Sequence, residues 1–206
     1  SYYIIYVFRE KENPLTNTNI IVTDCDGVLL DWETAFYEWM KSLGYNTQKE
    51  GVYDMADVFA MEKVEVKKLI REFNNSSWMA NLPVLRDARS GVAKLVEAGY
   101  EFHCVTSLSL DENTKMLRQQ NLDNVFGKGV FTKLVCLDTG ADKDEGLEPY
   151  KDSGLWWIED KTVNAECGLK FGMKPILISH NHNIDCDNPA ITKCDYWTDV
   201  VDTILN

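Results

Sequence analysis

Residues 20–29 decide the fold, and they read Ile20-Ile21-Val22-Thr23-Asp24-Cys25-Asp26-Gly27-Val28-Leu29. The first four residues form a largely apolar run, which is typical of a strand buried on both faces of a parallel sheet. Two carboxylates one residue apart and a glycine follow at once. In open α/β sheets ligands bind at the carboxyl ends of the strands. The stretch therefore predicts a parallel sheet with a site at Asp24 and Asp26.

Further apolar runs bounded by turn residues indicate the other strands. They lie at Phe102–Thr106, Val130–Leu137, Leu155–Ile158 and Pro175–Ser179. Segments with helical spacing separate them, including a helix over 84–98 that ends before Gly99. Alternating strands and helices predict an α/β fold, with a three-layer, Rossmann-like parallel sheet covered by helices on both faces.

Residues 31–80 interrupt this alternation. About fifty residues without a strand are too many for a loop in a compact domain. Apolar residues recur there at helical spacing, at Trp32, Phe36, Trp39, Met40 and Leu43, and again at Phe59, Val66, Leu69, Ile70 and Phe73. We therefore expect a small helical insertion over 31–80, a core domain of 19–30 and 81–206, and a tail or edge strand over 1–18.

Charge and composition exclude some classes of partner. The 206 residues carry 33 acidic against 21 basic side chains, a formal net charge of -12. This balance argues against a nucleic-acid polymer, because non-specific affinity for such polymers comes mostly from cationic side chains. A small phosphorylated molecule is compatible with it, since a bound divalent cation reverses the local field. No pattern indicates an oligomeric state.

The cysteines and the first residues indicate the cellular compartment in which the protein is expected. The six cysteines form no C-x-x-C pair, so we expect reduced thiols in a cytoplasmic protein and no zinc site built from cysteine. The apolar stretch Tyr2–Phe8 is too short to span a membrane and lacks the layout of a signal peptide. We therefore expect no membrane partner.

Two structural alternatives compete for Asp24 and Asp26. A calcium loop of the EF-hand kind needs glycine at its sixth position and glutamate at its twelfth, where this chain has Leu29 and Ala35. That alternative fails. The second alternative, acids that only cap a strand and its turn, stays open for the motif by itself.

Three later segments complement the pair of acids. Thr106-Ser107 ends a predicted strand with hydroxyl groups that suit phosphate oxygens, although such a pair is also common in turns. Lys143 precedes a short helical segment and suits phosphate charge, although it also fits a solvated surface lysine. Glu159-Asp160 ends another strand, where acids also serve as helix caps. Together with Asp24 and Asp26 it makes an oxygen-rich set suited to Mg²⁺.

In this order, the four motifs resemble those of the haloacid dehalogenase-like superfamily over about residues 19–180. A finer resemblance is to its 5'(3')-deoxyribonucleotidases. It rests on the residues 24–33, on Leu82-Pro83, on the segment 176–183 and on the tail 196–200. The resemblance implies a phosphatase whose insertion over 31–80 is a cap above the active site.

The resemblance also implies a mechanism. Asp24 would attack phosphorus and form an aspartyl-phosphate, while Asp26 would protonate the leaving oxygen and then take a proton from the attacking water. Mg²⁺ would be bound by Asp24, the backbone carbonyl of Asp26, Asp160 and Glu159, the last directly or through water.

Other residues would bind substrate in this scheme. Lys143, Thr106 and Ser107 would hold the equatorial phosphate oxygens, where charge accumulates. Trp32 is the candidate residue facing the substrate, with a place in the cap core as its alternative. His180 and His182 receive no chemical role, because H-x-H without further ligands is a weak zinc signal, and His103 receives none because it lies inside a predicted strand.

The sequence thus predicts a Mg²⁺-dependent phosphomonoester hydrolase, with (deoxy)nucleoside 5'-monophosphates as its expected substrates. The alternatives are a phosphatase for another small metabolite such as a sugar phosphate, a phosphatase for polynucleotide ends, and a non-catalytic binding module.

Overall fold

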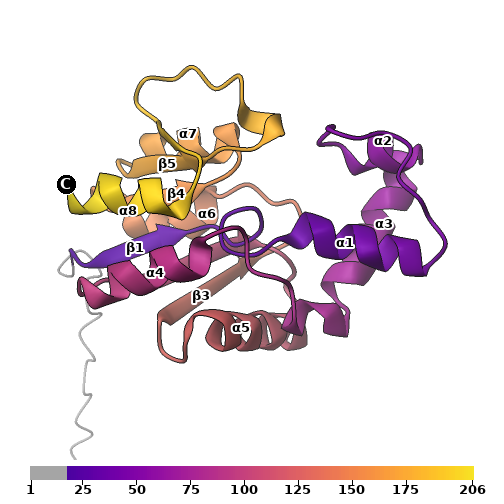
Figure 1. The fold of residues 1–206 in the computed structure, drawn as a ribbon, viewed down its shortest axis with the longest axis horizontal. Coiled ribbons are helices and arrows are strands. Elements are labelled where there is room, and N and C mark those ends of the chain that lie inside the picture. Colours follow the sequence, from indigo (N-terminus) through magenta and orange to yellow (C-terminus); the bar gives the residue numbers. More distant parts are fainter. Residues whose placement is uncertain (1–17) are drawn as a thin grey trace, which may run out of the picture.

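A computed structural model describes residues 18–206 and contains one six-stranded sheet (Figure 1). Its strands are β1 (Ile20–Thr23), β2 (Glu101–Ser107), β3 (Phe131–Leu137), β4 (Trp156–Glu159), β5 (Lys174–Ile178) and β6 (Thr192–Cys194). They lie in the order β3-β2-β1-β4-β5-β6, and every neighbouring pair is parallel. The α/β class and the parallel sheet predicted from sequence are confirmed.

Helices connect the strands and cover both faces of the sheet (Figure 1). The α-helices are α1 (Trp32–Ser42), α2 (Met55–Phe59), α3 (Lys63–Asn74), α4 (Ala88–Glu97), α5 (Glu112–Phe126), α6 (Asp144–Leu147), α7 (Thr162–Lys170) and α8 (Trp197–Leu205). Short 3₁₀ helices are η2 (Ser77–Ala80), η3 (Glu148–Tyr150) and η4 (Asn181–Asn183). None of the described helices is long and apolar enough to cross a lipid bilayer.

The two faces of β1 pack into different hydrophobic clusters. Ile21 belongs to a cluster with residues of α4, α5 and α8. Ile20 and Val22 point the other way and pack with residues of α6, η3 and β4. Because side chains alternate along a strand, this short apolar run fills the core on both sides of the sheet. The result is the three-layer arrangement expected from sequence.

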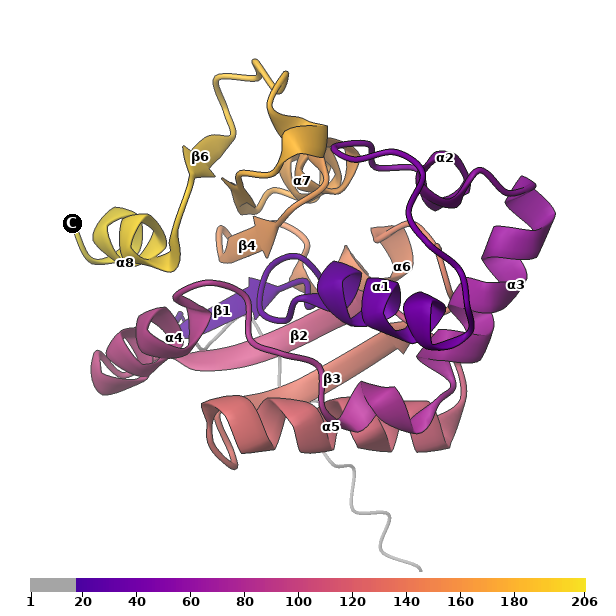
Figure 2. The ribbon, with the colours of Figure 1, turned by 45° about the vertical axis from the view of Figure 1, so that its right-hand side comes forward.

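The insertion, residues 31–80, lies beyond the carboxyl ends of the strands (Figures 1 and 2). It contains α1, α2, α3 and η2. The side chain of Asp31 accepts a hydrogen bond from the Thr34 N–H and so caps α1. The rings of Phe36 and Phe73 are fully buried and meet edge to face at 5.4 Å between centroids. These aromatic contacts form a local core for the insertion.

The structure differs from the sequence expectation in two places. Strand β6 was not predicted, because only three residues form it. The helix expected over 84–98 begins at Ala88, since Val84 forms a β-bridge with Leu30 and Arg86 has a φ of 42°. The tail or edge strand expected over 1–18 falls almost wholly outside the described residues.

A glycine allows α8 to pack closely on α4. A Cβ at Gly91 would lie 2.5 Å from Cβ of Trp197, far inside van der Waals contact. The indole of Trp197 is buried there and donates from Nε1 to the Val28 carbonyl at 2.8 Å. The contact between α4 and α8 therefore also supports the loop that follows β1.

We expect Gly91→Ala to lower the free energy of unfolding by about 1–3 kcal/mol, because the added methyl group overpacks the contact with Trp197. Without this contact the same change inside a helix would stabilise by about 1 kcal/mol. Urea denaturation measures the difference. The exposed neighbour Arg89→Ala is the control, and a more stable Gly91→Ala protein would contradict this account of the packing.

Candidate active site

The acidic ends of β1 and β4 meet at one edge of the sheet. The two strands are adjacent and parallel, with Thr23 aligned to Ile158. The N–H of Asp24 donates to the Ile158 carbonyl at 2.8 Å, so the next residues of both strands are neighbours. One carboxylate oxygen each from Asp24, Glu159 and Asp160 lies within 4.8 Å of the others, and all three residues are buried. The register of one strand pair thus builds an oxygen-rich group.

This group fits a divalent cation. Burial, followed by the charges of Asp24 and Asp160, raises the pKa of Glu159 well above its usual range. The Oδ1 atom of Asp160 is buried and has no hydrogen-bond partner among the described residues. A cation would both offset the repulsion and bind this oxygen, and carboxylate oxygens are the ligands that Mg²⁺ prefers in proteins. The donor set therefore suits Mg²⁺.

Glu159 is held by its own turn. Its Oε2 accepts hydrogen bonds from the N–H groups of Asp160 at 2.6 Å and Lys161 at 2.7 Å. Its Oε1 accepts from Nδ2 of Asn164 at 2.8 Å. Glu159 therefore fixes the loop that carries Asp160.

Lys143 lies inside the site and not on the surface. Only 2% of the residue is exposed, and its Nζ donates to Oδ1 of Asp24 at 3.0 Å and to the Val105 carbonyl at 3.2 Å. Burial alone would lower the pKa of Lys143, but the charges of Asp24 and Glu159 raise it above the usual value. The ammonium therefore stays charged beside Asp24.

Thr106 and Ser107 end β2, the other neighbour of β1. Thr106 is buried. The hydroxyl of Ser107 donates to the Ala141 carbonyl at 2.7 Å. This hydrogen bond joins the end of β2 to the loop that leads to Lys143. The phosphate-binding candidates from these two segments therefore lie near the carboxyl end of β1.

Asp26 lies apart from the three acids and forms an ion pair with Arg118 of α5. The guanidinium donates from both terminal nitrogens, at 2.8 Å to Oδ1 and 3.1 Å to Oδ2. Burial raises the pKa of Asp26, and the charge of Arg118 opposes that shift. Gly27, which follows Asp26, has a φ of 76°, and a Cβ there would lie 2.5 Å from Oδ2 of Asp160. Only glycine fits this turn without strain.

Two histidines that received no role from sequence support the acidic loops. Nε2 of His182 lies 2.9 Å from the Asp160 carbonyl oxygen and 3.2 Å from Oδ2 of the same residue. Nε2 of His180 lies 2.7 Å from the Gly27 carbonyl oxygen. Asn183 donates from Nδ2 to the Asp160 carbonyl at 2.7 Å. The signal in the sequence was their place just after a strand, at the same edge as the acids.

His103 is not part of this group. It lies within β2, and its Nδ1 is 2.8 Å from the hydroxyl of Tyr150 in η3. Burial, helped by the charge of Lys133, lowers the pKa of His103 to about 4. The residue is a neutral part of the core.

Trp32 packs inside the insertion. Its ring stacks on Phe36 with 4.7 Å between centroids and meets Phe73 edge to face at 5.6 Å. Its Nε1 donates to Oδ1 of Asn74 at 2.8 Å. These contacts are those of a core residue of the insertion, and Trp32 remains half-buried.

The insertion contacts the rest of the chain along two edges. On one edge, the Tyr53 ring lies 4.4 Å from that of His182, and Nζ of Lys161 lies 5.4 Å from the Tyr53 centroid. On the other edge, Arg71 forms an ion pair with Asp138 at 3.2 Å. These contacts join the insertion to η4 and the start of α7 on one edge and to the loop after β3 on the other.

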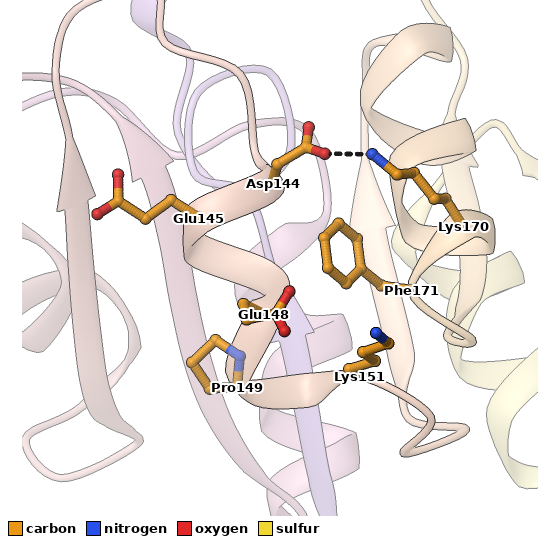
Figure 3. A pocket seen from close by; sticks show the side chains of 7 residues that line it. All are labelled: Asp144, Glu145, Glu148, Pro149, Lys151, Lys170 and Phe171. Atoms are coloured by element: carbon orange, nitrogen blue, oxygen red, sulfur yellow. Dashed lines mark hydrogen bonds and ion pairs between the residues drawn. The ribbon is translucent and has the colours of Figure 1, made fainter.

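A separate hollow lies between α6 and the end of α7 (Figure 3). Asp144 and Lys170 form an ion pair across its rim at 2.6 Å. The other residues that line it are Glu145, Glu148, Pro149, Lys151 and Phe171. The four acids of the candidate site do not line this hollow, so the hollow is not part of that site; they are Asp24, Asp26, Glu159 and Asp160.

Comparison with known proteins supports the fold. No protein-family model and no curated protein matches the sequence. A haloacid dehalogenase-like hydrolase from Streptococcus pneumoniae is 14% identical, with 92% of this chain and 99% of that chain covered and a TM-score of 0.63. A predicted phosphoglycolate phosphatase from Haemophilus somnus is 12% identical, with coverages of 90% and 97% and a TM-score of 0.59.

A third solved structure is CbbY from Rhodobacter sphaeroides in complex with xylulose 1,5-bisphosphate. It is 15% identical, with 88% of this chain and 95% of that chain covered and a TM-score of 0.57. At such low identity the likeness speaks for the fold. The chain has a haloacid dehalogenase-like fold, as the order of its motifs predicts.

Proposed function

We propose that this chain is a Mg²⁺-dependent phosphomonoester hydrolase that works through an aspartyl-phosphate on Asp24. The observation that carries the proposal is the meeting of Asp24, Glu159 and Asp160 within 4.8 Å at a strand edge, with the buried ammonium of Lys143 3.0 Å from Asp24. A buried nucleophile, an oxygen-rich cation site and a fixed positive charge are the groups that phosphoryl transfer requires.

Asp24 is the proposed nucleophile. It would attack phosphorus in line with the departing oxygen, and water would later hydrolyse the acyl phosphate. Asp24, Asp160 and the backbone carbonyl of Asp26 would hold Mg²⁺, which lowers the repulsion between an anionic nucleophile and a phosphate. Glu159 already accepts three hydrogen bonds, from the N–H groups of residues 160 and 161 and from Asn164. It would therefore act on Mg²⁺ through a bound water or through its charge, and not as a direct ligand.

Lys143 would bind the phosphate oxygens. Its burial means that its charge is little screened by solvent, so it acts strongly on charge that accumulates in the transition state. Thr106 and Ser107 would add hydroxyl and N–H donors from the end of β2. The Ser107–Ala141 hydrogen bond would fix the position of the donors at the end of β2 relative to Lys143.

Asp26 is the proposed acid and base. It would give a proton to the leaving oxygen and later take one from the attacking water. Its side chain is 26% exposed, unlike that of Asp24 at 9%, so it is open to a bound ester.

The insertion would act as a cap that excludes water and selects the substrate. Support comes from its position beyond the strand ends and from its contacts on two edges (Figure 2). Tyr53 and Lys161, which contact each other beside His182, are candidates for contact with the substrate. Trp32 stays a weaker candidate, because its indole N–H already binds Asn74.

The proposed substrate is a small phosphorylated metabolite such as a sugar phosphate. Two of the similar structures carry names with phosphoglycolate or a bound xylulose bisphosphate, and none of the three names a nucleotide. The nucleoside monophosphates expected from the finer resemblance are therefore the second candidate. The net charge of -12 disfavours polynucleotide ends.

The first prediction concerns the nucleophile. Asp24→Asn should reduce turnover by about 10⁴-fold or more, because the amide cannot form the acyl phosphate. Circular dichroism should stay native, since the amide oxygen can still accept from Lys143. Asp142→Asn, an exposed change in the neighbouring loop, is the control. Full hydrolysis by Asp24→Asn would refute the mechanism.

The second prediction concerns the cation. Mg²⁺ at a hundred times its dissociation constant should stabilise the wild-type protein by about 2.7 kcal/mol, seen as a higher melting temperature. Asp160→Asn should lose this increase, because it removes a charged ligand. Asp142→Asn should keep it. An equal Mg²⁺ effect in all three proteins would place the ion elsewhere.

The third prediction separates the candidate substrates. Across sugar phosphates, nucleoside 5'-monophosphates and a 5'-phosphorylated oligonucleotide, we expect kcat/KM to be at least about tenfold higher for the best sugar phosphate, a difference of about 1.4 kcal/mol. A preference for nucleotides would restore the finer resemblance. Binding without any turnover would favour the non-catalytic module.

A further inference from the structure

Arg118 is a fully buried arginine, and its guanidinium forms an ion pair with the carboxylate of Asp26. It lies on α5, none of its side chain is exposed, and both of its terminal nitrogens donate to Asp26. Its other close polar contact among the described residues is the sulfur of Met79, at 3.8 Å. Its Nε is buried and has no hydrogen-bond partner within residues 18–206. The hydrogen bonds of this side chain therefore converge on the carboxylate of Asp26.

Stability alone is a poor reason for such a pair. Removing two charges from water costs more than their attraction often returns, and apolar side chains of similar volume commonly replace buried pairs without loss. The pair also joins residues 92 positions apart, from the loop after β1 to the middle of α5. The buried ion pair is better explained by a function of the Asp26 carboxylate, which Arg118 orients.

The geometry fixes the direction in which Asp26 points. A bidentate fork holds both carboxylate oxygens in the plane of the guanidinium and uses one lone pair on each. The side chain of Asp26 is still 26% exposed, so its carboxylate is not enclosed by the ion pair. Arg118 thus holds Asp26 through both carboxylate oxygens, and the exposed part of the side chain stays available to a leaving group.

We propose that Arg118 is a positioning residue for the proton transfers of Asp26, an inference that rests on the proposed phosphatase function. As the phosphorus–oxygen bond breaks, Asp26 gives its proton to the ester oxygen and an alcohol leaves. Asp26 then takes a proton from the water whose oxygen bonds to phosphorus, which frees Asp24 and inorganic phosphate. Arg118 touches no reacting atom and keeps the acid within reach of both oxygens.

The test compares two leaving groups. Nitrophenolate departs without a proton, whereas an alkoxide requires one. In Arg118→Met we expect kcat/KM, which reports the steps up to departure of the leaving group, to fall about 10²-fold with an alkyl phosphate and less than about threefold with p-nitrophenyl phosphate, because general acid catalysis typically contributes 10²–10⁴-fold. The later attack of water is shared by both substrates, so it affects kcat for both and leaves the ratio of the two kcat/KM values unchanged. Arg118→Lys, which keeps the charge and loses the fork, should recover part of the alkyl phosphate activity.

Two further proteins separate positioning from stability. Asn121→Ala removes another buried polar side chain of α5, one that binds the backbone of Leu82. It should lower the melting temperature without changing the ratio of the two activities. Asp26→Asn with Arg118→Met removes both charges at once, so it leaves no unpaired ion. It should show the same ratio as Asp26→Asn alone, because Arg118 acts only through Asp26.

The outcomes distinguish the two proposals. If the wild-type protein hydrolyses neither ester with Mg²⁺, the phosphatase function fails and this inference falls with it. If the wild type is active but Arg118→Met loses both activities equally, only the role of Arg118 is overturned. A further loss in the double variant beyond Asp26→Asn would likewise overturn it.

Discussion

The pairing of β1 with β4 is the constraint on which the site depends. Parallel strands end at the same edge, so two acidic strand ends become neighbours once Thr23 aligns with Ile158. The carboxylates would repel one another strongly in a buried site. The buried ammonium of Lys143 offsets part of this repulsion at Asp24, and the three acids together could bind a cation that offsets the rest. The surrounding segments contribute hydrogen bonds and ion pairs that hold these like charges together.

The sequence was informative where local pattern and function coincide. Apolar runs located five of the six strands, and the acids at the ends of two of them indicated the site before any contact was known. Strand β6 was missed because three residues carry too little periodicity. Lys143 fits a surface lysine equally well in one dimension, and only the fold shows that it is buried.

The supporting residues could not be predicted, because their partners are distant in the chain. Arg118 lies in a helix with little amphipathic pattern, and nothing near it indicates a partner at Asp26. His180 and His182 look like a weak zinc motif, yet they bind the backbone around Gly27 and Asp160. Tyr53 lies in a segment of the insertion outside its helices. Long-range contacts of this kind arise from topology, which periodicity does not encode.

The loop after β1 has a further consequence, for the order in which the chain folds. It is held by Arg118 at Asp26, His180 at Gly27 and Trp197 at Val28, across separations of 92, 153 and 169 residues. Closing such long loops costs chain entropy before the contacts repay it, so folding rates fall as contacts become less local. The aromatic core of the insertion is local by comparison. We expect the insertion to gain structure early, and the catalytic loop to reach its final shape only after the last strand and helix have docked.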